Sequence, residues 1–161
     1  MVTAIIGIIS ALAVPKYERY KRKSQQAEVK LKLASIYTLE KTFYSEYSAY
    51  APDFNAIGFS PEGAKQWYMC GWGGAPFTSS ITGYTGGFTN AWISFNVPVE
   101  STFATNTTGC ATAVDINAAP LNQNDPQGIT AMCVGYLANF HPCDYWTIDN
   151  YKVLKNTING I

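Results

Sequence analysis

The chain has 161 residues, with 11 basic and 11 acidic side chains and a formal net charge of zero. General binding to nucleic acid therefore has no electrostatic support, and no nucleic-acid partner is expected. Charged residues and aromatic residues each make up 14% of the chain, which excludes a disordered protein and favours a well-packed one. The length fits one domain together with a long helix.

The N-terminal stretch, residues 1–47, is the longest predicted element. Its first fourteen residues carry no charge, Pro15 follows, and neither proline nor glycine occurs from Lys16 to Tyr47. A helix over this stretch would be about 70 Å long, whereas a domain of about one hundred residues has a radius of gyration of about 13 Å. One end must therefore project, and the projecting end is apolar. We expect a helical arm over residues 1–26 and a globular head over residues 27–161, with the arm covered by a bilayer or by other copies.

The apolar start of the arm is short. Residues 1–14 would span ~21 Å as a helix, less than the roughly 30 Å of a bilayer core, so we expect further apolar residues to precede Met1. Gly7 and Pro15 are the weak points, because glycine and proline disfavour a helix interior. We expect a kink in lipid, and the turns between these two residues can melt under different packing.

A basic cluster follows Pro15. It contains Lys16, Arg19, Lys21, Arg22 and Lys23, with Glu18 among them. The positive-inside rule would place this flank in the cytoplasm, whereas the cysteines described below place the head outside. We follow the cysteines, because the charges on the other side of the apolar segment are not seen. Two interpretations of the basic cluster are left open: a solvated helix face that contacts lipid headgroups, or a more specific role.

Two apolar stripes run along the second half of the predicted helix with helical spacing. One stripe contains Val29, Leu33, Ile36, Phe43 and Tyr47, and the other contains Ala27, Leu31, Ala34 and Tyr37. A helix packed on one sheet needs a single stripe. The pattern therefore predicts either a helix buried on both sides, by its own sheet and by neighbouring molecules, or one broad core face.

Turn residues end the helix, and strands follow. Pro52, Gly58, Pro61 and Gly63 interrupt residues 48–63. Four segments rich in aromatic and β-branched residues are predicted strands: 66–72, 91–97, 129–137 and 145–153. The short gap between Leu137 and Tyr145 predicts a hairpin loop. One long helix followed by strands indicates an α+β fold, with the helix across one face of an antiparallel sheet of about four strands.

The four cysteines favour disulfide bonds and an oxidising compartment, because their number is even and the surrounding composition suits an extracellular surface. They are Cys70, Cys110, Cys133 and Cys143. Their wide spacings and the single histidine, His141, disfavour zinc. Proximity along the chain favours Cys133–Cys143 with Cys70–Cys110, and a Cys70–Cys133 bridge between strands is the alternative.

The N-terminal third resembles the type IV pilin family, through the motif AIIGIISALAVPKYERY (Ala4–Tyr20) and the long helix that ends in FYSEY. Weaker similarity to type IVa major pilins with larger heads continues through DFNAIGFSPEG and DYWTIDNYKVLKN. The resemblance implies a subunit that waits in the inner membrane with its head in the periplasm. A prepilin peptidase would remove a basic leader, and an assembly ATPase and often a retraction ATPase would drive the filament. The aromatic first residue and the early glutamate of the family are not present.

The resemblance also implies roles for individual residues. Those expected in filament assembly are Ile5, Ile6, Gly7, Ile8, Ile9, Leu12, Val14 and Pro15, with melting between Gly7 and Pro15. The frequent C-terminal staple of the family favours Cys133–Cys143. Independently, Asn106 begins an Asn-Thr-Thr triplet and is a possible glycosylation site. Asp115, Asp125, Asp144 and Asp149 could hold calcium, but no EF-hand spacing occurs, and packing or turn roles are expected instead.

The predicted function is that of a structural subunit of a type IV pilus at the cell surface, serving adhesion, twitching motility or DNA uptake. One alternative is a minor pilin or a type II secretion pseudopilin. Another is a membrane-anchored periplasmic enzyme or binding module. The sequence disfavours an enzyme, because it contains no nucleophile–base constellation and no glycine-rich phosphate loop. No cofactor and no catalytic residue are expected.

Overall fold

The computed structural model describes residues 2–51, 53–60, 67–72, 81–86, 129–135, 137, 144–159 and 161. One helix, α1 (Val2–Tyr47), precedes the strands. These are β1 (Tyr68–Trp72), β2 (Thr130–Gly135), β3 (Asp144–Asp149) and β4 (Leu154–Ile158). The predicted α+β fold, a long helix packed on an antiparallel sheet, is confirmed.

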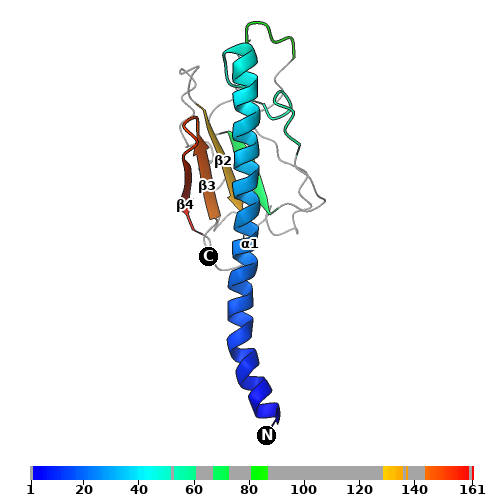
Figure 1. Cartoon of the computed structure of the whole chain (residues 1–161), viewed down its shortest axis with the longest axis vertical. Coiled ribbons are helices and arrows are strands. Elements are labelled where there is room, and N and C mark those ends of the chain that lie inside the picture. Colours follow the sequence, from blue (N-terminus) through cyan, green and yellow to red (C-terminus); the bar gives the residue numbers. More distant parts are fainter. Residues whose placement is uncertain are drawn as a thin grey trace, which may run out of the picture.

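Helix α1 is continuous and projects far beyond the sheet. Figure 1 shows the sheet beside the half of α1 that is distant from the N-terminus, while the other half extends away from the head. Pro15 lies inside the helix, and the turns between Gly7 and Pro15 are helical in this single chain. Melting of these turns on assembly stays a prediction. Within the described residues, no helix offers a stretch long and apolar enough to span a bilayer.

The strands form a four-stranded sheet in the order β1-β2-β3-β4, and every neighbouring pair is antiparallel. The predicted strands at 66–72 and 129–137 are confirmed as β1 and β2 with shorter ends. Strands β2 and β3 are antiparallel neighbours, as the predicted hairpin between Leu137 and Tyr145 requires. The predicted strand at 91–97 lies outside the described residues.

The strand predicted at 145–153 is confirmed as β3 over its first half, but its extension through residues 150–153 is wrong. Strand β3 ends at Asp149, and the chain turns back into β4, a strand that was not predicted. Asp149 makes this turn, because its Oδ1 accepts hydrogen bonds from the backbone N–H groups of Tyr151 (3.0 Å) and Val153 (2.8 Å). Lys152 takes a left-handed conformation, with φ of 64°. Asp149 and Asn150 are typical turn residues, and this pair in the sequence could have indicated the turn between β3 and β4.

The core lies between α1 and the sheet and is closed by the segments after α1 and around residue 81. Its buried members are Val29, Leu33, Ile36, Phe43, Ala51, Phe54, Ile57, Phe59, Tyr68, Cys70, Ile81, Ile129, Ala131, Cys133, Trp146 and Ile148. Helix α1 packs against β2 and β3. Gly58 has φ of +68°, which glycine adopts without strain in the turn that leads to Phe59.

Of the two predicted stripes of α1, one belongs to this core, and of the other only Tyr37, which is half-buried, packs against it. Val29, Leu33 and Ile36 are fully buried. In contrast, Ala27, Leu31 and Ala34 are exposed, and Leu31 exposes 72% of its surface. The alternative of one broad core face is therefore wrong. We call Ala27, Leu31 and Ala34 the outer stripe.

Candidate functional site: the apolar arm and its attachment to the head

The projecting arm exposes large apolar side chains. Of the residues predicted for filament assembly, Ile5 and Ile6 expose 58% of their surfaces, Ile9 61% and Val14 62%. Gly7 and Pro15 are also exposed, and the side chains of Ile8 and Leu12 lie outside the described part of the structure. An apolar surface of this extent marks a site of interaction with protein or membrane.

The outer stripe is a second exposed apolar surface of α1, at the level of the head. Ala27 and Ala34 are small, and Leu31 projects between them into solvent. Small residues on a helix allow another helix to approach closely, and the central leucine supplies apolar area. The stripe faces away from the chain's own core, so another molecule can reach it.

Asp144 attaches the arm to the sheet. Its carboxylate is fully buried at the start of β3 and accepts hydrogen bonds from four side chains. The donors are Gln26 of α1 (3.0 Å to each oxygen), Tyr68 OH of β1 (2.5 Å), Trp146 Nε1 of β3 (2.7 Å) and Asn156 Nδ2 of β4 (2.9 Å). A buried carboxylate must be compensated in this way. One side chain thus connects the helix with three strands.

The environment of Asp144 shifts the pKa of Tyr68. Burial raises the pKa of its phenol well above the usual range, and the hydrogen bond to the Asp144 carboxylate raises it further. The phenol therefore remains a donor at all ordinary pH values. Calcium binding was one alternative for Asp144 and Asp149, and packing or turn roles were expected instead. Asp144 accepts hydrogen bonds from side chains packed around it, and Asp149 makes a turn, as the expected roles require. Asp115 and Asp125 lie outside the described residues.

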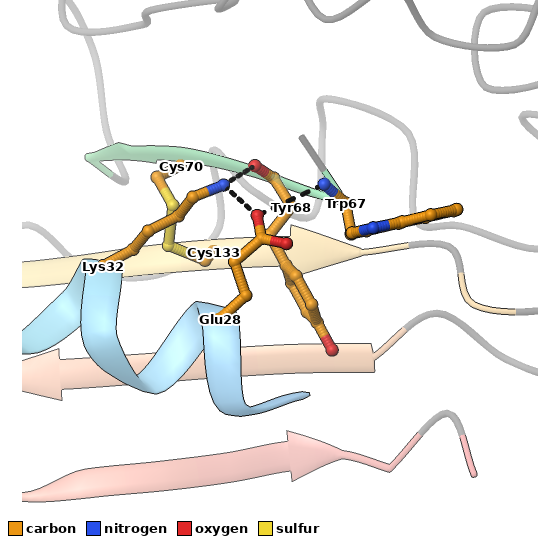
Figure 2. The surroundings of a disulfide bond; sticks show 6 residues. All are labelled: Glu28, Lys32, Trp67, Tyr68, Cys70 and Cys133. Atoms are coloured by element: carbon orange, nitrogen blue, oxygen red, sulfur yellow. Dashed lines mark hydrogen bonds and ion pairs between the residues drawn. A yellow bond between two sulfur atoms is a disulfide. The ribbon is translucent and has the colours of Figure 1, made fainter. Parts of the chain in front are cut away.

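A second polar contact joins α1 to β1 beside the disulfide (Figure 2). Lys32 exposes 9% of its surface, forms an ion pair with Glu28 (2.5 Å) and donates to the backbone carbonyl of Tyr68 (3.4 Å). Glu28 Oε1 also accepts from the backbone N–H of Trp67 (3.3 Å). Removing Glu28 would leave the buried ammonium of Lys32 without its carboxylate partner, which is destabilising. No pattern in the sequence marks this pair, because its two residues differ from other exposed-looking charges of α1 only in their burial.

The preferred disulfide pairing is wrong. Cys70 of β1 is bonded to Cys133 of β2, 63 residues away, which is the alternative considered above. The antiparallel register places the two residues directly opposite each other (Figure 2). Cys133–Cys143 and Cys70–Cys110 are therefore excluded, and Cys110 and Cys143 lie outside the described residues. Proximity along the chain failed as a guide, because strand pairing brings distant segments together.

Glu40 of α1 makes a third polar contact with a distant part of the backbone. Its side chain exposes 1% of its surface, and Oε2 accepts a hydrogen bond from the backbone N–H of Ala51 (3.1 Å). Oε1 is buried without a hydrogen-bond partner in the described part of the chain. Burial raises the pKa of this carboxyl well above 4.5, and the bond from Ala51 opposes the shift. Glu40 ties the segment after α1 back onto the helix.

These contacts give the head a fixed position on α1 and leave the arm free to contact other molecules. Asn106, the possible glycosylation site, lies outside the described residues. Where the structure describes side chains, no group of three or more metal-ligating residues occurs. The arrangement offers binding surfaces on α1, namely the apolar arm and the outer stripe.

A scan against protein-family models gives no match. The chain is 44% identical over 62 residues to the type IV major pilin protein PilA of Myxococcus xanthus (strain DK1622). The matched region covers 38% of this chain and 28% of that protein, so the chain spans under a third of the relative's length. Over the matched residues the chain is similar to a type IV major pilin, and its long N-terminal helix packed on a four-stranded antiparallel sheet is consistent with a pilin fold.

Proposed function

We propose that this chain is the repeating structural subunit of a type IV pilus, a cell-surface filament held together by packing of the N-terminal helices. The observation that carries the proposal is the exposed apolar arm. Ile5, Ile6 and Ile9 each expose more than half of their surface in the single chain (58%, 58% and 61%). Each such side chain gains roughly 1.5–3 kcal/mol when it is fully buried from water. A polymer whose arms bundle along its axis buries all of them.

The outer stripe supports the same proposal. Leu31, between Ala27 and Ala34, has no cover from its own head. In a filament, a neighbouring subunit's helix would cover it, so that α1 is buried on both sides. This is the first of the two alternatives that the pair of stripes predicted.

The life cycle that we propose follows the family. Before assembly the arm is solvated by the lipid of the inner membrane, with the head in the periplasm, where the Cys70–Cys133 disulfide can form. A prepilin peptidase processes the precursor, and the pilus assembly and retraction machinery moves subunits between membrane and filament. Exchange of lipid for other arms replaces one apolar environment by another, which keeps assembly reversible.

The test is cryo-electron microscopy of filaments sheared from the cell surface. The expected map has this sequence traced in every subunit, with the arms at the axis and Leu31 in contact with a neighbour. If the abundant filament is built from another polypeptide, the chain is a minor pilin or a pseudopilin. Absence of the chain from every filament would overturn the proposal. The same map reads the state of the Gly7–Pro15 segment directly.

A further inference from the structure

The arm carries a ring of positive charge directly above its apolar segment. We call Lys16, Arg19, Lys21, Arg22 and Lys23 the basic collar. Together with Glu18, these five residues leave a net charge of +4 over residues 16–23. Four of them are exposed, and Arg22 is half-buried. Among the described residues, none of the five forms an ion pair with a carboxylate, so the charge is not neutralised within the chain.

The charges surround the helix rather than line one side of it. At 3.6 residues per turn, Lys16 and Lys23 lie on one side, and Lys21 lies about 150° away from them. A partner that binds in a groove or along one face would need a stripe. Charges on all sides of the helix suit a partner that surrounds the helix, as a lipid layer does. The head begins only beyond the collar, where Gln25 is buried and Gln26 contacts Asp144.

The collar is long enough to cover the depth of a layer of lipid headgroups. Residues 16–23 rise about 10 Å along the helix, and a headgroup region adds roughly 5–8 Å on each side of the hydrocarbon core. Within the arm, the last exposed aliphatic side chain before the collar is that of Val14 (62% exposed). Tyr17 and Tyr20, exposed by 68% and 69%, lie within it. Tyrosine is typical of the boundary between lipid and water, where its ring and hydroxyl are both accommodated.

From this geometry we infer that the basic collar binds anionic phospholipid headgroups and holds the unassembled subunit at a fixed depth in an acidic membrane. The inference rests on the membrane stage of the proposed function and adds the class of lipid. The positive charge of the collar complements an anionic surface. Each lysine or arginine near such a surface increases the affinity of the protein for the membrane about fivefold. The apolar arm inserts into neutral and anionic bilayers alike, so the collar supplies the preference between them.

The experiment measures how the purified full chain distributes between vesicles of phosphatidylcholine and vesicles that also contain phosphatidylglycerol. Because the apolar arm contributes equally to both, the ratio of bound protein isolates the collar. The chain is expected to favour the anionic vesicles, and raising the salt concentration is expected to reduce the preference. Lys16→Gln with Lys23→Gln should lower it by about 25-fold, at about fivefold for each lysine.

The matched control is Lys152→Gln with Lys155→Gln. It removes the same charge from the head, at and after the turn between β3 and β4, which lies at the end of the sheet distant from the arm (Figure 1). This variant should keep the preference for anionic vesicles. Circular dichroism of both variants checks that α1 is retained.

Three results would overturn the inference. The chain could distribute equally between the two kinds of vesicle. The collar and control variants could lose the preference equally, which would assign it to overall charge. The third is salt-sensitive association of the full chain in neutral detergent that only the collar variant abolishes, because the occupant would then be a second copy. Vesicle binding requires no polymer, so failure of the filament proposal in the sheared-filament map is distinguishable from failure here.

Discussion

Gln26 of α1 and Asp144 of β3, 118 residues apart in the chain, are joined by hydrogen bonds of 3.0 Å from one amide nitrogen to both carboxylate oxygens. The same carboxylate receives the Tyr68 hydroxyl and the Trp146 indole N–H. The long helix is therefore attached to the sheet by a specific polar contact as well as by its apolar face. In the proposed filament, this contact would help to transmit force between arm and head.

Asp144→Asn should destabilise the head by about 3 kcal/mol, because an amide N–H₂ then faces donors that were bonded to a charged oxygen. The measurement is urea denaturation of the full chain in detergent, followed by tryptophan fluorescence. Asp149→Asn is the control, since its Oδ1 can still accept from Tyr151 and Val153 and it lies in an exposed turn. Equal losses in the two variants would contradict a special role for Asp144.

The Cys70–Cys133 disulfide closes 63 residues, and the chain-entropy relation gives about 4 kcal/mol for a loop of that length. The double substitution Cys70→Ala with Cys133→Ala should therefore lower the free energy of unfolding by up to that amount. Mass spectrometry of a non-reduced digest should recover the peptide pair joined through Cys70 and Cys133. Recovery of a pair joined through Cys133 and Cys143 would show that the assigned bond is incorrect.

The burial of Glu40 should make the stability of the folded chain depend on pH. Its pKa in the folded chain is raised above 4.5 by burial, so the folded state binds the proton more tightly than the unfolded state. Its contribution to stability is present below pH 4.5 and is lost as the pH rises through the folded pKa. Urea midpoints measured from pH 4.5 upward should fall for the native chain. In Glu40→Gln this part of the slope should vanish, whereas Glu46→Gln, an exposed change, should retain it.

Leu31→Glu separates folding from assembly. Leucine and glutamate have similar helix propensities, and Leu31 exposes 72% of its surface, so the free energy of unfolding should change by less than about 0.5 kcal/mol. In the proposed filament the new carboxylate would be buried between helices, and surface filaments should be lost. Electron microscopy and the yield of sheared protein measure this. Tyr151→Glu, at a residue 80% exposed on the turn between β3 and β4, should still give filaments.

Local signals were reliable for α1 and weaker for the sheet. The helix follows from residues that favour helices and from the absence of internal glycine and proline after residue 15, and the spacing of Val29, Leu33 and Ile36 predicted its buried face. Strand β4 was missed, because the turn at Asp149 and Asn150 interrupts a run with high strand propensity. The outer stripe could be recognised from its spacing, but only the position of the sheet showed that it is exposed.

The sequence by itself determined the long helix, its projecting apolar end and the α+β class, because these depend on composition and on periodicity within one segment, and its N-terminal motif carried the resemblance to pilins. The tertiary structure decided which cysteines pair, which stripe of α1 is buried, and that Asp144, Glu28 and Lys32 attach the helix to the sheet. Each of these relationships joins residues brought together by strand register or by the packing of α1 on the sheet. Contacts between distant segments depend on how those segments are placed in space, which no local pattern encodes.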